Sequence, residues 1–381
     1  MAYFDNAATT FPKPECVYNQ MDLIYRQMGG SFGRGNNAFS HSTKQLADET
    51  RILLQRIFHC PAKQVVFQPT ATISLIVIIQ GLIVSGAKTI FISPFEHNAV
   101  TRILHHYEDL KLITIHQLSV TKDLQYDLQR IQYQFDNDHP DLVIVSHASN
   151  VIGLVAPVEE IFQLAKKYEA KTVLDMSQTA GLVDCNVGLE SFDFAVFAGH
   201  KTLLGPTGIS GFVMMPNINL SPVLFGGTGF ESANQQMPAN LPERYEIGTM
   251  NTAGLVGLNA ALKWIDEKGT ENYYTDELSK RNRLLSLLSG YDFIQIVGNA
   301  NGRKYVGIVS CIIKGIASDT AGLIFSEQGI AVRTGLHCAP LAHRFLGTYP
   351  AGTIRFSVSC FTSNQDFDEL KDALDYIGEN L

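Results

Sequence analysis

The chain lacks an apolar run long enough to cross a membrane, which takes about 18 uninterrupted apolar residues. The nearest approach, Ile73–Val84, is interrupted by Ser74 and Gln80. The first residues also carry neither the basic stretch nor the apolar stretch of a signal peptide. These absences predict a cytoplasmic protein with no membrane partner.

Charge of one sign is not concentrated anywhere in the chain. The 29 Lys and Arg residues are scattered, and the formal net charge is −8. A nucleic-acid surface needs a block or a stripe of basic residues. We therefore expect no nucleic-acid partner.

Cysteine is sparse and dispersed. The six cysteines form no CxxC pair and no Cys/His ligand spacing, so no metal site is predicted. Without an export signal, the thiols are expected to be reduced. Apolar neighbours predict that Cys185 and Cys311 are buried, whereas Cys338 lies in a different setting that is described below.

The chain has no internal repeat and no low-complexity linker; it has instead an alternation of strand and helix signals. Helices are predicted at Ser42–Phe58, Ile73–Val84 and Pro157–Tyr168. Strands are predicted at Val65–Phe67, Thr89–Ser93, Leu112–Ile115, Leu142–Ser146, Thr172–Leu174, Phe194–Phe197 and Gly211–Met215. This alternation indicates an α/β fold with a mostly parallel sheet covered by helices on both faces.

The pattern changes near residue 252. Two helices, Ala253–Lys268 and Glu271–Leu288, come first. Strands near Phe293–Val297, Val306–Ile313 and Ile354–Ser359 then mix with helices at Ser318–Glu327 and Asn364–Glu379. We interpret this as a large α/β domain, residues 1–252, followed by a smaller α+β domain, residues 253–381. Whether the first 20 or so residues pack on the small domain is left open.

Lys201 is the most informative residue, because it follows an apolar strand in the run Ala198-Gly199-His200-Lys201. A second apolar strand ends in Asp175-Met176-Ser177-Gln178. Strand ends of an α/β sheet converge on one crevice, so an amine, an imidazole, a carboxylate and an amide can surround one ligand. Pyridoxal 5'-phosphate (PLP) needs this set: a lysine for the Schiff base, a carboxylate for the pyridinium proton, and small donors for the phosphate and phenolate. Taken alone, Lys201 also fits a surface lysine.

A phosphate site is predicted just before the helix that begins at Ile73. Thr70, Ala71 and Thr72 stand between a strand and this helix, so free backbone N–H groups and a hydroxyl face the crevice. The tripeptide alone also fits a simple threonine N-cap. His200 adds a candidate donor.

Two further polar residues follow strands of the same sheet. His97 comes just after Thr89–Ser93, where its ring can stack on a planar cofactor. Asn150 follows Leu142–Ser146 and can donate to a phenolate or a carboxylate. Each is weak support alone, but both fall at sheet ends with the other candidates.

Cys338 lies in the run Arg333-Thr334-Gly335-Leu336-His337-Cys338-Ala339-Pro340. Gly335 and Pro340 indicate a loop, so this cysteine is expected to be more exposed than a core cysteine. Arg333, His337 and His343 are expected to favour its thiolate. Arg355 opens a later strand, and its guanidinium suits an amino-acid carboxylate. A loop with a chance cysteine and a salt-bridging arginine is the alternative.

The chain resembles the cysteine desulfurase and selenocysteine lyase group of class-V aminotransferase-like, fold-type I PLP enzymes. The resemblance runs from Asn6-Ala7-Ala8-Thr9-Thr10 to the C-terminus. The most specific pieces are Asp175-x-x-Gln178, Ala198-Gly199-His200-Lys201 with Gly205-Pro206-Thr207-Gly208, Tyr245-Glu246-Ile247-Gly248-Thr249, and Arg333-Thr334-Gly335-Leu336-His337-Cys338. The compact cysteine loop is similar to that of the SufS-like branch, which includes selenocysteine lyases.

The resemblance implies a cytoplasmic, homodimeric enzyme with active sites at the subunit interface and a sulfur-acceptor protein as partner. With PLP, it would convert L-cysteine to L-alanine and leave a persulfide on Cys338. A selenocysteine lyase, or a class-V aminotransferase or C–S lyase acting on another amino acid, remains the alternative.

The resemblance also implies individual roles. Lys201 would form the Schiff base and move the α-proton, and Cys338 would attack the substrate sulfur. His97 would stack on the PLP ring, Asp175 would contact the pyridinium nitrogen, and Gln178 would donate a hydrogen bond to the phenolate oxygen. The phosphate would be held by Ala71, Thr72, His200 and the neighbouring subunit's Thr249. The substrate would be held by Asn150, Arg333 and Arg355.

Some positions depart from the family pattern. Ala198 stands where many relatives have Ser, and Ile73 and Ile76 stand where an acidic residue and Asn are common. We therefore expect the phosphate to be held more weakly or in a different way. The stretch 225–242, rich in Gly and polar residues, is a candidate cover for the site.

Overall fold

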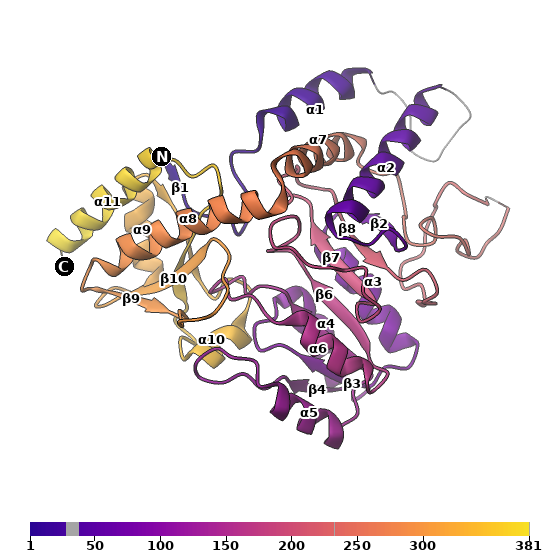
Figure 1. Cartoon of the computed structure of the whole chain (residues 1–381), viewed down its shortest axis with the longest axis horizontal. Coiled ribbons are helices and arrows are strands. Elements are labelled where there is room, and N and C mark those ends of the chain that lie inside the picture. The colour runs from indigo at the N-terminus through magenta and orange to yellow at the C-terminus, as the bar shows by residue number, and fades with distance from the viewer. Residues whose placement is uncertain (28–37, 232, 381) are drawn as a thin grey trace.

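The computed structural model describes residues 1–27, 38–231 and 233–380. Its main sheet contains β2 (Gln64–Gln68), β3 (Thr89–Ile92), β4 (Thr114–Gln117), β5 (Leu142–Ser146), β6 (Lys171–Asp175), β7 (Phe194–Ala198) and β8 (Ser210–Met214). The strand order is β2-β8-β7-β6-β5-β3-β4 (Figure 1). All neighbours from β7 to β4 are parallel, and β8 is antiparallel to β2 and β7. The predicted mostly parallel sheet is confirmed.

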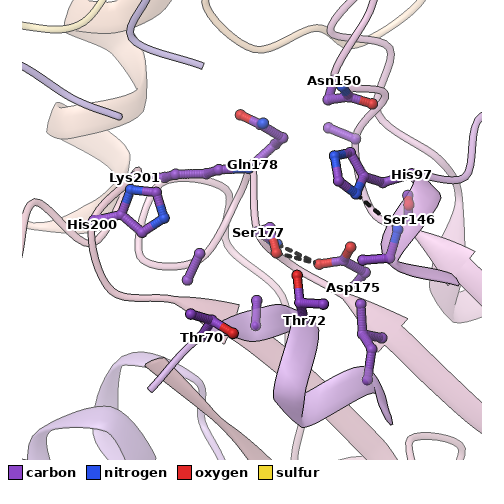
Figure 2. A pocket seen from close by; sticks show the side chains of 15 residues that line it. Thr70, Thr72, His97, Ser146, Asn150, Asp175, Ser177, Gln178, His200 and Lys201 are labelled. Carbon is purple, nitrogen blue, oxygen red and sulfur yellow. Dashed lines mark hydrogen bonds between the residues drawn. The ribbon is translucent and has the colours of Figure 1, made fainter. Parts of the chain in front are cut away.

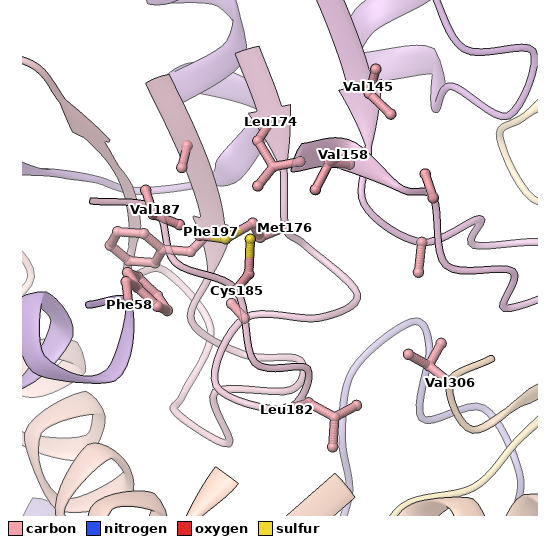
Figure 3. Packing of buried hydrophobic residues seen from close by; sticks show 14 of the residues in the cluster. Phe58, Val145, Val158, Leu174, Met176, Leu182, Cys185, Val187, Phe197 and Val306 are labelled. Carbon is pink, nitrogen blue, oxygen red and sulfur yellow. The ribbon is translucent and has the colours of Figure 1, made fainter. Parts of the chain in front are cut away.

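Helices bury both faces of this sheet. They are α1 (Glu15–Gln27), α2 (Ala38–Ile57), α3 (Ala71–Val84), α4 (Asn98–Asp109), α5 (Leu128–Asn137), α6 (Val158–Lys166) and α7 (Thr252–Lys268). Val173 of β6 belongs to a core cluster with α3 and α4. Its neighbour Leu174 belongs to the opposite cluster, with α2, α5, α6 and α7, part of which Figure 3 shows. Strands buried on both faces read as continuous apolar runs, which explains why the sequence predicts them well.

A second, antiparallel sheet has the order β12-β13-β10-β9. Its strands are β9 (Ile294–Val297), β10 (Ile308–Ile313), β12 (Arg333–Gly335) and β13 (Thr353–Ser357), and its part of the chain also holds α8 (Thr270–Ser289), α9 (Ser318–Glu327), α10 (Pro340–Leu346) and α11 (Asn364–Glu379). The N-terminal strand β1 (Ala2–Tyr3) pairs with β11 (Ile330–Ala331) in this part of the molecule (Figure 1). The domain division at residue 252 stays a prediction.

Several strands begin or end one or two residues from their predicted bounds, and β4 and β10 each begin two residues later than predicted. β4 begins at Thr114, whereas the prediction begins at Leu112. The Leu112 side chain is exposed, so its apolar character does not mark a buried strand. Within the described residues, no helix combines the length and the apolarity needed to pass through a bilayer.

Candidate active site

A cavity of about 220 Å³ opens where β3, β5, β6 and β7 end and where α3 and α4 begin. Figure 2 shows its side chains pointing toward one shared space. The structure thus brings together eight of the predicted site residues: Ala71, Thr72, His97, Asn150, Asp175, Gln178, His200 and Lys201. This convergence follows from the parallel strand order.

The turn that carries Lys201 is held by close packing and by the N-terminal segment. A Cβ at Gly199 would lie 2.2 Å from the Ile209 carbonyl oxygen, so only glycine fits before His200. The Thr10 backbone N–H donates to the His200 oxygen (3.1 Å), and the Thr10 hydroxyl donates to the Lys201 oxygen (3.0 Å). The sequence prediction gave Thr10 no role, although it lies in a segment that carries the family resemblance.

The surroundings of Lys201 favour the neutral form of its amine. Burial lowers its pKa from 10.5 to about 8, and the nearby Arg355 and Arg333 add to this effect, while Asp175 opposes it. A neutral amine is the nucleophilic form. Lys201 therefore lies in a desolvated pocket beside cationic groups.

The Asp175 carboxylate is anchored through one oxygen. Asp175 Oδ1 accepts from the Ser177 backbone N–H (2.9 Å) and from the Ser177 hydroxyl (2.5 Å). Beside it, Ser146 lies opposite Asp175 in the β5–β6 register and donates from its N–H and its hydroxyl to Glu96. Burial raises the pKa of Glu96 to about 8. Neither Ser177 nor Glu96 was predicted as a site residue.

His97 is the N-cap of α4, and its ring nitrogen Nδ1 accepts from the Ala99 N–H (3.0 Å). The proton of a neutral ring is therefore assigned to Nε2. Burial, with a contribution from Lys201, lowers the His97 pKa to about 4. The ring is thus neutral at pH 7 and lies at the edge of the cavity (Figure 2).

The phosphate end of the cavity shows a fit to PLP. Thr70 is the N-cap of α3, and its hydroxyl oxygen accepts from the Ile73 N–H (3.2 Å). The backbone N–H groups of Ala71 and Thr72 lie in the first helical turn, where a helix has no internal partner for them. His200 Nδ1 is buried without a partner, an orphan that a phosphate oxygen would satisfy. With an amine, a carboxylate and a neutral ring beside it, this set fits PLP.

Two predicted amide donors already have protein partners. Gln178 Nε2 donates to the Ala7 oxygen (3.0 Å), and Asn150 Nδ2 donates to the His337 oxygen (2.7 Å). A primary amide has two N–H donors, so each side chain retains one for a ligand.

The Cys338 loop connects β12 with α10. Cys338 and His337 both have positive φ angles, 58° and 48°, which turn the chain sharply. The Cys338 carbonyl accepts from the Asn98 N–H (2.7 Å), and Arg333 Nη2 donates to the Cys338 sulfur (3.2 Å). Cys338 is partly exposed, whereas Cys185 and Cys311 are buried, as predicted.

The two histidines of this region do not act as the expected cations. His337 Nε2 pairs with the Thr353 hydroxyl, and burial lowers its pKa to about 2. His343 Nδ1 pairs with the Thr348 hydroxyl, and burial lowers its pKa to about 4. Both rings are therefore neutral, so the expectation that they favour the thiolate is wrong. Arg333 is the cation in contact with the sulfur.

Arg355 lies opposite Arg333 in the β12–β13 register and is 1% exposed. Its Nη1 donates to the Asn150 oxygen (2.9 Å) and its Nη2 to Asp5 Oδ1 (2.7 Å), while Nε is buried without a partner. This Nε–H has no protein acceptor, and Arg355 does not line the cavity. Asp5 was not predicted, because its contact with Arg355 joins distant parts of the chain.

Four predicted site residues do not line this cavity, namely Arg333, Cys338, Arg355 and Thr249. Thr249 is exposed and lines a separate cavity of about 130 Å³, together with Glu246 and Asn251. Apart from residue 232, which lies outside the described residues, the stretch 225–242 does not line the main cavity. Among the described residues, no group of three or more His, Cys, Asp or Glu side chains is arranged to hold a metal ion.

Known proteins match the whole chain. Residues 2–370 match the family model described as Aminotransferase class-V. "Probable cysteine desulfurase 2" of Mycobacterium leprae (strain TN) is 30% identical over 99% of this chain and 93% of its own length. "Probable cysteine desulfurase" of Pyrococcus abyssi (strain GE5 / Orsay) is 28% identical, over 100% of this chain and 94% of its own.

A solved structure agrees with these sequence matches. The apo structure of a cysteine desulfurase from Thermococcus onnurineus NA1 superimposes with a TM-score of 0.90 at 26% identity. It covers 100% of this chain and 95% of that one. This chain therefore belongs to the class-V aminotransferase family and, within it, to the cysteine desulfurases.

Proposed function

We propose that this protein is a PLP-dependent cysteine desulfurase that converts L-cysteine to L-alanine and keeps the sulfur as a persulfide on Cys338. The observation that carries the proposal is the Cys338 loop beside the Lys201 cavity. The Cys338 thiol, Arg333 and Arg355 all lie close enough to Lys201 to influence its pKa. A transaminase needs no thiol at this position.

Bound PLP would supply an electron sink for negative charge at the substrate α-carbon. Lys201 would hold the cofactor through Nζ and move the α-proton, a role that its lowered pKa favours. Asp175 would keep the ring nitrogen protonated, and the neutral His97 ring would stack on the cofactor. The other donors would be Gln178 for the phenolate, and Ala71, Thr72, His200 and the partner subunit's Thr249 for the phosphate.

The substrate carboxylate would bind Arg355 through its free Nε–H, with help from Asn150 and Arg333. Cys338 Sγ would then attack the substrate sulfur, forming the S–S bond while the Cβ–S bond breaks. The electron pair of that bond stays on Cβ, which takes up a proton to complete the methyl group of alanine. The step balances without an external oxidant. Arg333 Nη2, at 3.2 Å from Sγ, donates a hydrogen bond to the attacking sulfur.

The test measures alanine formation from L-cysteine by the PLP-loaded protein with a thiol reductant, which releases the persulfide as sulfide. We expect both Cys338→Ser and Lys201→Ala to reduce turnover roughly 100-fold or more, the range of a lost reacting group. Cys360→Ser is the matched control, because Cys360 is another partly exposed cysteine but, unlike Cys338, is not among the groups that influence the pKa of Lys201.

The outcomes separate this function from its relatives. Turnover that survives in Cys338→Ser but not in Lys201→Ala would favour a C–S lyase that needs no persulfide. A PLP-loaded wild type that is inert toward L-cysteine but active on L-selenocysteine, or on another amino acid with a keto acid, would replace the proposal by a selenocysteine lyase or an aminotransferase.

We also propose a cytoplasmic homodimer that passes its persulfide to an acceptor protein. The six cysteines, all free, support a reducing compartment. The position of Thr249 outside this chain's own cavity supports a site completed by a second subunit.

A further inference from the structure

One oxygen of the Asp175 carboxylate receives two hydrogen bonds from a single residue. The Ser177 backbone N–H and the Ser177 hydroxyl both donate to Oδ1, at 2.9 and 2.5 Å, as Figure 2 shows. Among the described residues, these are the donors to this carboxylate, so Oδ2 has no protein donor. Both residues line the cavity and are more than nine-tenths buried.

This arrangement determines which oxygen the cavity presents. The terminal torsion of an aspartate is broad and roughly two-fold, so the carboxylate plane is not fixed by its own rotamer. Two donors that converge on Oδ1 fix this plane and leave Oδ2 for a ligand. The backbone N–H would be present with any residue at position 177, whereas the hydroxyl depends on serine.

We propose that Ser177 is a positioning residue that fixes the Asp175 carboxylate so that Oδ2 faces the protonated ring nitrogen of PLP. This inference rests on the PLP use proposed above and adds a residue to it. Ser177 acts through Asp175 and does not itself contact the reacting atoms.

A merely structural role for the hydroxyl is a weaker explanation, because the turn has its own backbone bonds. The Met176 carbonyl accepts from the Thr179 N–H and from the Ala180 N–H, both at 2.9 Å. These bonds do not involve the Ser177 side chain. The turn is therefore expected to persist, and the protein to fold, when the hydroxyl is removed.

The experiment compares PLP affinity of the wild type, Ser177→Ala and Ser177→Thr by fluorescence titration of protein freed of cofactor. A hydrogen bond to a charged group is worth enough to expect roughly tenfold weaker binding in Ser177→Ala. Ser177→Thr keeps a hydroxyl and is expected to bind within about threefold of the wild type. Ser359→Ala is the matched control, since Ser359 is a buried serine whose hydroxyl oxygen accepts from the Phe361 N–H (3.2 Å) and which does not line the cavity.

A second measurement follows the absorption band of the bound cofactor as the pH is varied. The band reports the protonation of the Schiff-base nitrogen. Loss of a well-placed carboxylate makes the ring nitrogen easier to deprotonate, and a neutral ring makes the Schiff-base nitrogen more basic, so the band of Ser177→Ala is expected to change at higher pH than that of the wild type. A loss of stability alone would not move this band.

Three results would overturn the inference. The first is a wild type that binds PLP together with a Ser177→Ala variant that has the same PLP affinity and the same pH dependence of the absorption band. The second is equal weakening in Ser177→Ala and Ser177→Thr, which would remove the role of the hydroxyl. The third is a wild type that binds no PLP, which would overturn the proposed function as well.

Discussion

At the scale of single residues, the lowered pKa of Lys201 makes capture of the cofactor dependent on pH. A protonated amine cannot attack the PLP aldehyde, and burial brings the Lys201 pKa from 10.5 down to about 8. The neutral fraction therefore rises as the pH rises through about 8. We expect the rate of PLP capture by cofactor-free protein, measured by stopped-flow absorbance, to reach half of its maximum near pH 8.

The control for this prediction is Nα-acetyl-lysine, whose side-chain amine is free, under the same conditions. Its amine keeps an ordinary lysine pKa of about 10.4, so its reaction with PLP rises over two pH units later. A capture rate that follows the Nα-acetyl-lysine profile would show that the Lys201 ammonium is not destabilised by its surroundings.

The sequence predicts those site residues that lie close to the end of a strand. Lys201, Asp175 and His97 each follow an apolar strand, and the parallel sheet alone brings such residues together. Asp5 could not be found in this way, because it contacts Arg355 from the other end of the chain. The neutral state of His337 also depends on burial, which its neighbours in sequence do not indicate.

At the scale of elements, the long buried strands were predicted and the shortest ones were not. β1 and β11 have two residues each and β12 has three, too few to show any periodicity. β12 nevertheless decides the geometry of the site, because its register places Arg333 opposite Arg355. Like charges opposite each other repel, so this pairing favours a bound anion.

The contact between the segment after β1 and β13 yields a prediction about stability. The Asp5 carboxylate forms an ion pair with the buried guanidinium of Arg355. The Asp5 backbone also forms a β-bridge with Ser357. Removing one partner of a buried ion pair leaves an uncompensated charge. We expect Asp5→Ala to lower the free energy of unfolding by about 3 kcal/mol, measured by urea denaturation. Asp5→Asn, which keeps an oxygen acceptor, should lose less.

Asp22→Ala serves as the control for this experiment. Asp22 pairs with Arg26 on the exposed surface of α1, and such pairs contribute little to stability. No measurable change in unfolding is expected for it. Equal unfolding curves for Asp5→Ala and the wild type would show that the N-terminal segment does not stabilise Arg355.

At the scale of the whole molecule, the position of Thr249 favours a site that a second subunit completes. Thr249 is exposed and lies apart from the cavity that holds Lys201. Exposed aromatic residues in the loops before it, Phe225 at 75% and Phe230 at 39%, give this region an apolar surface that a second copy could cover. We therefore expect a dimer in sedimentation experiments and a phosphate contact made in trans.

A hybrid dimer distinguishes contacts made in trans from contacts within one chain. Thr249→Glu places a negative charge where the phosphate of PLP is expected, so this variant alone should bind PLP poorly and be inactive. Lys201→Ala alone should be inactive as well. If Thr249 acts on the neighbouring subunit, a hybrid of the two variants contains one site with both native residues, and desulfuration activity should return. If Thr249 acts within its own chain, neither site of the hybrid is native, and co-expression should restore nothing.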